Sequence, residues 1–360
     1  MGTNYLISFI IPVWNREKII GICLDSILSQ ALELSFEIII VDDSSSDNTV
    51  LFVQDICGNG TAKRISCCRL ADMMPISVSI FREMDIMSEL EIRSRIHLVR
   101  LEKHQGVAMA RNKGLEMAKG KYIWFVDSDD FIAKGALKKV KAILNSNIFD
   151  ILRFDKQNLL SVPNTYTIPY MNEDLKIMNM NNVYDLLYML RIGAVWCAIF
   201  RKEFIANYCF DTRFSYSEDS LFSWEVTLRA KTAAYFNVPL YGYMFTPKSL
   251  TSVKPFERFD CYISVVKGYI KAIQKSEKSE KEKAVLVKEC EKRLYLHAFH
   301  TYAYSEITSE MWDRWYEVYL EVMVDNEMRA KWERLISNIL WRIRSKKLFI
   351  FIYNCILKHK

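Results

Sequence analysis

The feature that most constrains the fold is a regular alternation of apolar runs and amphipathic stretches over the first 155 residues. Apolar runs occupy 6–13, 36–43, 95–101, 122–126 and 149–154. Apolar side chains recur with helical spacing over 16–30, 107–119 and 134–145. Strands that are apolar on both faces, separated by helices, are typical of mostly parallel sheets covered by helices on both sides. We therefore expect an α/β fold.

Capping residues predict where some of these helices begin and end. Gly120 stands directly after one predicted helix, where it would close the helix in the left-handed conformation. Asp47 precedes another and is expected to cap its N-terminus. Later in the chain, Ser217 followed by Glu218 and Asp219 is typical of a helix N-terminus, because the helix dipole favours acids there.

The pattern changes along the chain and indicates three regions. Strands and helices alternate over 1–155, except in the segment 58–93, which we interpret as an insertion that is partly helical near 81–92. This insertion either covers the edge of the sheet or provides a contact for a partner or a membrane. Short strands and helices mix over 156–255, and 256–360 is almost entirely helical in pattern.

The middle region contains four recognisable elements. We expect helices at 181–193 and 217–231, a strand at 194–200, and a pair of strands around Pro239.

Composition limits the possible functions. The nine cysteines show no CxxC pair, and no signal peptide is visible, so we expect reduced thiols in the cytoplasm and no zinc site. The net charge of +6 comes from the end of the chain, because 334–360 holds seven Lys or Arg residues and no acid. The rest has 42 basic and 43 acidic residues, and so nearly neutral a body argues against nucleic-acid binding.

Acidic side chains cluster where two predicted strands end. Asp42 and Asp43 follow one strand, and Asp127, Asp129 and Asp130 follow another. Ligands of open parallel sheets bind outside these carboxyl ends. Because side chains alternate along a strand, Asp127 and Asp129 are expected to point the same way. Two such carboxylates suit Mg²⁺ or Mn²⁺ with a substrate diphosphate, whereas the alternative is that they only cap a turn.

Two common nucleotide-binding motifs are missing. The first strand is followed by PVWNRE, with no GxGxxG, and the chain has no GxxxxGK[ST]. A dinucleotide site and a P-loop are therefore not supported. Sugar nucleotidyltransferases usually place a Gly-rich loop with a basic residue after the first strand, where this chain has PVWNRE, so a metal-bound diphosphate is expected to act as a leaving group and not as the attacking phosphate.

Five segments carry a resemblance to a known family: SFIIPVWNRE, FEIIIVDDSSSDNT, GVAMARNKGLEMAKGKYIWFVDSDD, YSEDSLFSWEVTLRAK and PLYGYMF. Over most of 6–252 the chain resembles glycosyltransferase family 2, whose members have the Rossmann-like GT-A fold and invert the sugar linkage. The resemblance implies a catalytic domain at 1–255, with a nucleotide-binding half at 1–155 and an acceptor-binding half at 156–255. The helical region 256–360 is then a C-terminal extension.

The resemblance further implies a nucleotide-sugar donor, usually linked to UDP. The implied donor-binding residues are Pro12, Trp14, Asn15, Glu17, Asp42, Asp43, Arg111, Asp127 and Lys248. Trp14 stands where Tyr is common, so it keeps the stacking surface without the hydroxyl. Lys248 either closes over the diphosphate or is an ordinary surface lysine, and His104 is interpreted as a loop residue near the donor cleft.

The same resemblance assigns the metal and the catalytic acids. Asp129 is implied as the principal ligand of Mn²⁺ or Mg²⁺, with Asp127 at the metal or the ribose. Asp219 would be the general base that takes the proton of the acceptor hydroxyl, and Glu218 would orient the acceptor or Asp219. A helix cap is the alternative for both acids of this pair.

The end of the chain predicts a membrane contact. Trp332, Trp341, a basic cluster at 342–347 and an apolar stretch at 348–357 are typical of an interfacial helix on anionic lipid. The apolar stretch is too short to span a bilayer, and packing on the domain is the alternative. Processive synthases of the resembled family carry transmembrane spans and a QxxRW motif, neither of which this sequence shows. The resemblance therefore implies transfer of a single sugar to a glycan or lipid-linked acceptor in bacterial surface polysaccharide assembly, at the cytoplasmic face of the membrane.

Two rival interpretations remain at this stage. The first is a non-catalytic relative that binds nucleotide-sugars or glycans. The second is nucleic-acid binding through the basic tail, which predicts a steep dependence on salt.

Overall fold

The computed structural model describes residues 5–57, 86–160, 167–168, 172–245 and 255–304. The chain forms two compact units, Met1–Thr246 and Pro247–Lys360. The N-terminal unit contains every described strand, and the described part of the C-terminal unit consists of two helices.

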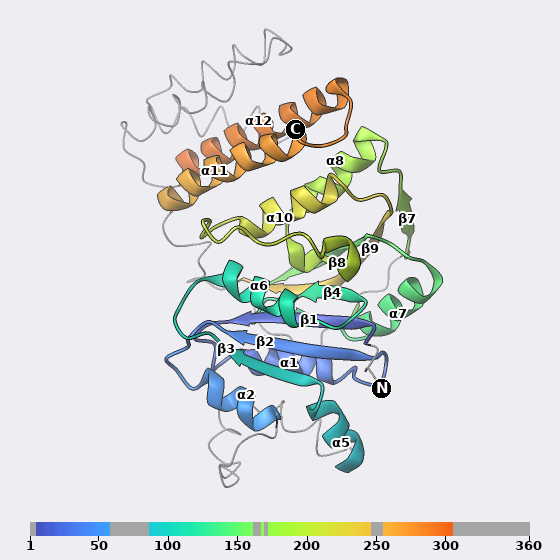
Figure 1. Cartoon of the computed structure of the whole chain (residues 1–360), viewed down its shortest axis with the longest axis vertical. Helices are drawn as coiled ribbons and strands as arrows, with labels where there is room; N and C mark the ends of the chain where they lie inside the picture. The colour runs from blue at the N-terminus through green and yellow to red at the C-terminus, as the bar shows by residue number, and fades with distance from the viewer. Residues whose placement is uncertain (1–4, 58–85, 161–166, 169–171, 246–254, 305–360) are drawn as a thin grey trace. The chain divides into compact units, whose positions relative to one another are not determined.

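A single sheet forms the centre of the N-terminal unit (Figure 1). Its strands are β1 Ile7–Val13, β2 Phe36–Asp42, β3 Ile96–Arg100, β4 Tyr122–Phe125, β5 Phe131–Ile132, β6 Ile151–Leu159, β7 Leu175–Met178, β8 Ala198–Arg201 and β9 Ala233–Met244. The spatial order is β3-β2-β1-β4-β8-β6-β9-β5, and β7 pairs with β9 outside this path.

The predicted parallel arrangement holds for the first part of the sheet. Strands β3, β2, β1 and β4 are neighbours and all run in parallel. Beyond β4 the sheet is mixed, because β8 is antiparallel to both β4 and β6, while β6 and β9 are parallel. Strands β5 and β7 are antiparallel to β9. The α/β class is confirmed, with a mixed second half.

Two predicted elements of the second half differ in the structure. The expected strand pair around Pro239 is one strand, β9, whose pairing with β6 shifts register where Pro239 faces Asp155. Proline cannot donate a ladder hydrogen bond, so it produces an irregularity without ending the strand. The expected strand at 194–200 begins instead with a short 3₁₀ turn, η1 (Val195–Cys197), and becomes extended only in β8.

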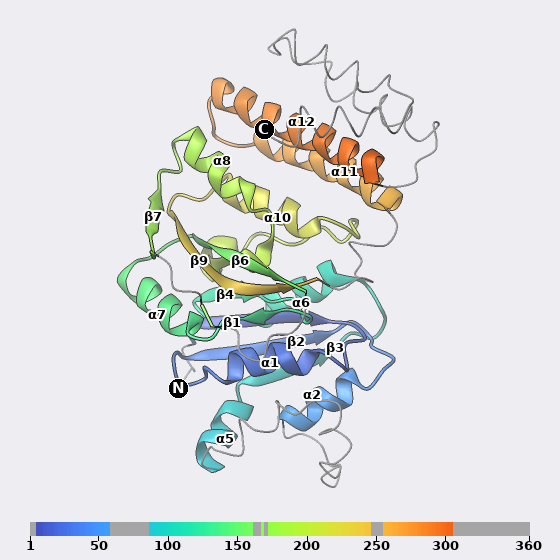
Figure 2. The same cartoon turned by 180° about the vertical axis from the view of Figure 1, so that it is seen from behind.

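Helices cover both faces of the sheet. They are α1 Ile20–Leu28, α2 Thr49–Cys57, α5 Ile86–Arg93, α6 Val107–Met117, α7 Ala136–Ser146, α8 Val183–Arg191, α9 Lys202–Ile205 and α10 Glu218–Thr227. Figures 1 and 2 show α6 on one face of the parallel strands and α1 on the other. The helical part predicted for the insertion is confirmed by α5.

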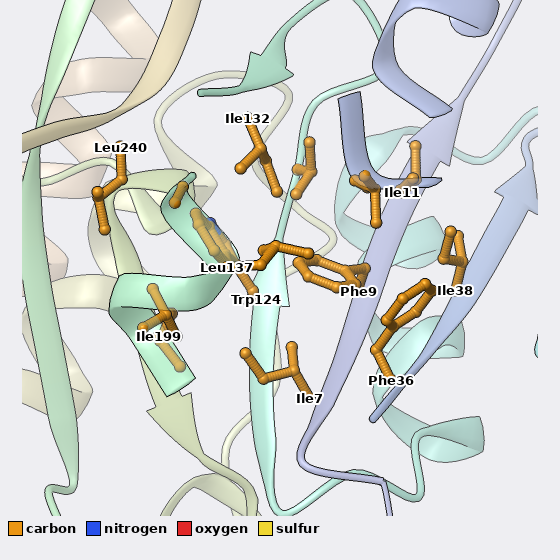
Figure 3. Packing of buried hydrophobic residues seen from close by; sticks show 14 of the residues in the cluster. Ile7, Phe9, Ile11, Phe36, Ile38, Trp124, Ile132, Leu137, Ile199 and Leu240 are labelled. Atoms are coloured by element: carbon orange, nitrogen blue, oxygen red, sulfur yellow. The ribbon is translucent and has the colours of Figure 1, made fainter. Parts of the chain in front are cut away.

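The main core lies between the sheet and helices α1 and α7. Phe9 of β1 packs against Phe36 and Trp124, with ring centroids 5.7 and 5.6 Å apart (Figure 3). Leu137 of α7 joins the same buried cluster, as does Leu24 of α1. Burying these large apolar side chains fixes the parallel strands and hence the edge at which their carboxyl ends meet.

Gly120 does not close a helix, so its predicted role is wrong. Helix α6 already ends at Met117, and the described glycines with positive φ are Gly106 and Gly135. A Cβ on Gly120 would lie 2.5 Å from the backbone nitrogen of Ser8. Gly120 is therefore required because the chain passes too close to β1 for a side chain.

The described part of the C-terminal unit is a pair of helices, α11 Pro255–Gln274 and α12 Glu280–Tyr304, that pack against each other. Buried apolar side chains line their contact, including Val266 and Ile273 from α11 and Leu286 from α12. In the part of the chain that the structure describes, no helix combines the length and apolarity needed to cross a membrane. The predicted tail helix lies outside the described residues.

Candidate active site

Two loops interlock at the carboxyl ends of β1 and β2. The amide nitrogen of Asn15 donates to Ser45 Oγ at 2.9 Å, and Asn15 Oδ1 accepts from the amide of Ser46 at 2.8 Å. Glu17 Oε2 accepts from both the amide and the side chain of Asn48, each at 2.9 Å. The structure therefore uses Asn15 and Glu17 to join the two loops that the sequence predicted to form the donor site.

The two acids after β2 are also held by the protein. Asp43 is buried, and its carboxylate accepts from the amides of Gln105 and Gly106, both at 2.7 Å. Asp42 is fully buried; one oxygen accepts from Ser45, and Arg100 Nε lies 3.4 Å from it. These contacts draw the loop after β3 toward the loop after β2. Asp47 accepts from the amide of Thr49 at 3.0 Å, in agreement with its predicted capping role.

An exposed aromatic pair stands beside these loops. Trp14 is 43% exposed, and the ring of His104 stacks on it at 4.2 Å between centroids. His104 Nδ1 lies 2.8 Å from Asp43 Oδ2, so the imidazole joins Trp14 to the buried acid. Pro12 lies in β1 just before this loop and is buried. The sequence placed His104 near the donor cleft, but nothing in its spacing predicted the stack on Trp14.

The acids after β4 lie in a tight turn, and capping a turn was the alternative role expected for them from the sequence. The amide of Asp130 donates to the carbonyl of Asp127 at 3.0 Å. Because β4 already ends at Phe125, strand alternation does not explain how Asp127 and Asp129 point. Their side chains are nevertheless 26% and 23% exposed, and burial together with the Asp127 charge raises the pKa of Asp129.

Asp130 has a separate role within the turn. It is buried, accepts from the hydroxyl of Tyr241 at 2.9 Å and from the amide of Met244 at 2.8 Å. The Tyr241 hydroxyl in turn accepts from the amide of Asp127 at 3.0 Å. Burial and the two neighbouring acids raise the pKa of Asp130 to about 8. Asp130 thus attaches the turn to β9, a tertiary role that sequence reasoning missed.

Arg111 connects the turn to the beginning of α10. Its Nη2 lies 2.8 Å from Asp127 Oδ1, and its Nη1 lies 2.6 Å from Glu218 Oε1. Arg111 and Glu218 are both buried. The sequence placed Arg111 near the nucleotide, whereas its immediate partners here are two carboxylates from different halves of the unit.

The two acids that open α10 have different surroundings. Glu218 is paired with Arg111, while Asp219 Oδ1 accepts from the amide of Ser220 at 2.7 Å. Burial and the Glu218 charge raise the pKa of Asp219 to about 7, against the opposing effect of Arg111. The predicted helix start is confirmed, because α10 begins at Glu218 with both acids in its first turn, but Ser217 has a left-handed φ of 59° and makes no capping bond through its side chain.

The acidic turn offers oxygen ligands for a divalent cation. Among the described residues, no group of three or more His, Cys, Asp and Glu side chains could hold a metal ion. Asp127 and Asp129 nevertheless present two partly exposed oxygen donors of like charge, and Arg16 lies 3.5 Å from Asp129. Such a pair fits Mg²⁺ or Mn²⁺, which take their remaining ligands from water and phosphate. Lys248 lies outside the described residues.

Comparisons with known proteins agree with this architecture. The family model described as Glycosyl transferase family 2 matches residues 8–71 and 84–208. The crystal structure of S. aureus TarS 1–349 in complex with UDP superposes with a TM-score of 0.63 at 19% identity, covering 98% of this chain and 92% of that chain. The fold is therefore GT-A.

Two curated relatives are similar in sequence. The uncharacterized glycosyltransferase EpsJ of Bacillus subtilis (strain 168) is 28% identical over 69% of this chain and 63% of its own length. A poly(ribitol-phosphate) beta-glucosyltransferase of Bacillus spizizenii is 24% identical over 93% of this chain, but only 44% of its own length is covered. The family model matches more than half of the residues of this chain, and the chain therefore belongs to glycosyl transferase family 2.

Proposed function

We propose that the chain is an inverting glycosyltransferase that moves one sugar from a UDP-sugar to a glycan or lipid-linked acceptor in bacterial surface polysaccharide assembly. The observation that carries the proposal is the approach of two acid groups, Asp127 in the turn and Glu218–Asp219 on α10, through the two short bonds of Arg111. The similarity to a transferase named for a poly(ribitol-phosphate) acceptor, and to TarS bound to UDP, supports the substrate classes.

Donor binding is assigned to the interlocked loops after β1 and β2. Trp14 offers an exposed indole on which a nucleobase can stack. Asn15, Glu17, Asp42 and Asp43 hold those loops in place through the contacts described above, so they position the loops on which the donor would bind. We keep Pro12 and Lys248 in the proposed donor site from the resemblance.

The metal is assigned to the acidic turn. Asp129 and Asp127 would hold Mn²⁺ or Mg²⁺ there, and the bound ion would offset the charge on the departing diphosphate. Asp130 cannot serve in the same way, because its two oxygens are occupied by Tyr241 and Met244.

The base is assigned to Asp219. Glu218 is engaged in its ion pair with Arg111, whereas Asp219 has no arginine at hydrogen-bonding distance in the described residues. Asp219 would take the proton from the acceptor hydroxyl while that oxygen bonds to C1 of the sugar. The bond from C1 to the diphosphate oxygen breaks on the opposite face, which inverts the linkage.

The test is turnover of a UDP-sugar panel by the purified full chain in Mn²⁺, with Asp219→Asn as the matched control. We expect release of UDP from at least one donor, and a loss of about 10²–10⁴-fold in the variant. A wild type no faster than Asp219→Asn for every donor would contradict the proposal. If UDP still bound in a manner sensitive to EDTA, the chain would be a non-catalytic nucleotide-sugar-binding relative.

A further inference from the structure

We propose that Arg111 is a positioning residue that holds α10 against the acidic turn, in place of the nucleotide contact implied by the resemblance. The inference rests on the proposed function, because the spacing of these acids matters only if both sides act on one donor and one acceptor.

The geometry of the guanidinium carries the inference. Arg111 is only 3% exposed, and each of its outer nitrogens meets a different carboxylate, Asp127 at 2.8 Å and Glu218 at 2.6 Å. A guanidinium is planar and rigid, so two acids bound to its two ends are held at a fixed separation. Both outer nitrogens are therefore engaged before any nucleotide arrives.

Aromatic packing holds the guanidinium in this orientation. Its central carbon lies 5.5 Å from the ring centroid of Phe210. Phe210 stacks on Phe222 of α10, with centroids 4.2 Å apart and an interplanar angle of 7°. Arg111 is therefore joined to α10 twice, once through the charge of Glu218 and once through this stack.

Asn112, the residue after Arg111, holds Phe210 in place through hydrogen bonds and not through charge. The side chain of Asn112 donates to the carbonyl of Phe210 at 2.8 Å and accepts from its amide at 2.7 Å. Asn112 touches neither acid in these bonds. It therefore provides a matched control, because its loss loosens the segment before α10 and leaves the charge bridge intact.

The bridge also explains how two adjacent acids can differ. Arg111 forms ion pairs with Glu218 and Asp127, so Asp219 is the acid that remains available to the acceptor. If Arg111 were lost, Asp127 and Glu218 would become buried or half-buried charges without their cation. Such carboxylates are no longer held at a fixed separation, and the distance from the acidic turn to Asp219 would no longer be set.

The first test separates turnover from donor binding in Arg111→Lys. Lysine keeps the positive charge but cannot bridge two acids with a planar fork. We expect kcat for donor turnover to fall about 10²-fold, as for other misplacements near 1 Å, while the Kd for UDP with Mn²⁺ stays near that of wild type. Asn112→Ala should lower kcat much less than Arg111→Lys, because both ion pairs of Arg111 remain. If Arg111→Lys instead weakened UDP binding and left kcat unchanged, Arg111 would be a nucleotide ligand and the inference would be overturned. An equal loss of kcat in Asn112→Ala would overturn it as well.

The second test does not depend on turnover. Urea unfolding of Arg111→Met, Glu218→Gln and the double variant forms a thermodynamic cycle. We expect the double variant to be more stable than Arg111→Met alone, because the second change removes an unpaired buried carboxylate. Strictly additive effects would overturn the inference, and Arg111→Gln, which also removes the positive charge, replaces Arg111→Met if the latter does not fold. A wild type that turns over no donor would refute the proposed function while this cycle still reports on the bridge.

Discussion

The two adjacent acids at the start of α10 have similar side chains but different partners. Glu218 meets an arginine and is held as a buried ion pair, whereas Asp219 accepts from the backbone amide of Ser220. An acid without a partner cation in a buried place holds its proton to higher pH. This difference leads to a prediction about the pH dependence of the reaction.

We expect kcat/KM for donor and acceptor to rise with pH and level off above about pH 7. Asp219 must be deprotonated to accept a proton, and burial raises its pKa to about 7. Below that value the rate should fall about tenfold per pH unit, because the ionised fraction falls in that proportion. A pH–rate profile measures this. A wild-type rate that stays constant from about pH 5 to pH 9 would exclude Asp219 as the base.

A second residue-scale prediction concerns Trp14. Its exposed ring is proposed to stack on the nucleobase, and stacking on an aromatic side chain contributes about 1–3 kcal/mol per base. Trp14→Ala should therefore weaken UDP binding at least fivefold or so, whereas Trp14→Tyr should retain most of the affinity. Isothermal titration with UDP and Mn²⁺ gives both values. Equal affinities for the alanine and tyrosine variants would show that the indole does not stack on the base.

Helix α6 and the turn after it lie close to β1 because glycine has no side chain at the points of contact. The backbone freedom of glycine is not what these positions require. Gly114 faces Ile10, where an added Cβ would lie 2.3 Å from Ile10 Cγ2. Gly120 meets the backbone of β1 directly, and its amide donates to Ser8 Oγ at 2.7 Å. Close packing at these two points fixes α6 against β1. Arg111, which belongs to α6, is thereby held next to the acidic turn.

We expect Gly120→Ala to lower the free energy of unfolding by about 1–3 kcal/mol, as for other overpacked sites. The added Cβ would lie 2.5 Å from a backbone atom, which cannot move aside as the end of a side chain could. Lys119→Ala, at the exposed neighbouring position, should change stability little. Urea denaturation compares the two. Similar small effects for both variants would mean that the turn relaxes easily.

The predicted interfacial helix at the end of the chain lies outside the described residues and stays a prediction. Its basis is the seven basic residues and no acid over 334–360, together with an apolar stretch. We propose that this tail brings the catalytic unit to anionic membrane, where lipid-linked acceptors are found. The body of the chain has almost no net charge that could do so.

We expect the full chain to sediment with vesicles containing phosphatidylglycerol and not with neutral phosphatidylcholine vesicles. Binding should weaken as salt rises, because screening reduces the attraction between the basic cluster and the lipid surface. Deleting residues 334–360 should remove the binding. Sedimentation of the shortened chain to the same extent as the full chain would place the contact elsewhere, and the insertion at 58–93 would be the next candidate.

Much of the fold followed from local pattern. Apolar runs without alternation predicted β1, β2, β3 and β4 and a mostly parallel sheet. Strands β1, β2 and β4 are buried throughout, whereas the edge strand β3 is buried only at Ile96. The second half followed less well. Its strands pair with partners far away in the sequence, so neither the antiparallel position of β8 nor the single long strand β9 is written in local periodicity.

The sequence by itself determined where the chemistry-bearing groups occur: acids at the ends of β2 and β4, an acid pair at the start of α10, and a tryptophan after β1. Only the tertiary structure decided what each acid does. Asp130 is held by Tyr241, Glu218 is paired with Arg111, and Asp219 keeps a raised pKa. The physical reason is that charge, desolvation and hydrogen bonding depend on neighbours in space, and those neighbours come from segments as far apart as α6, α10 and β9.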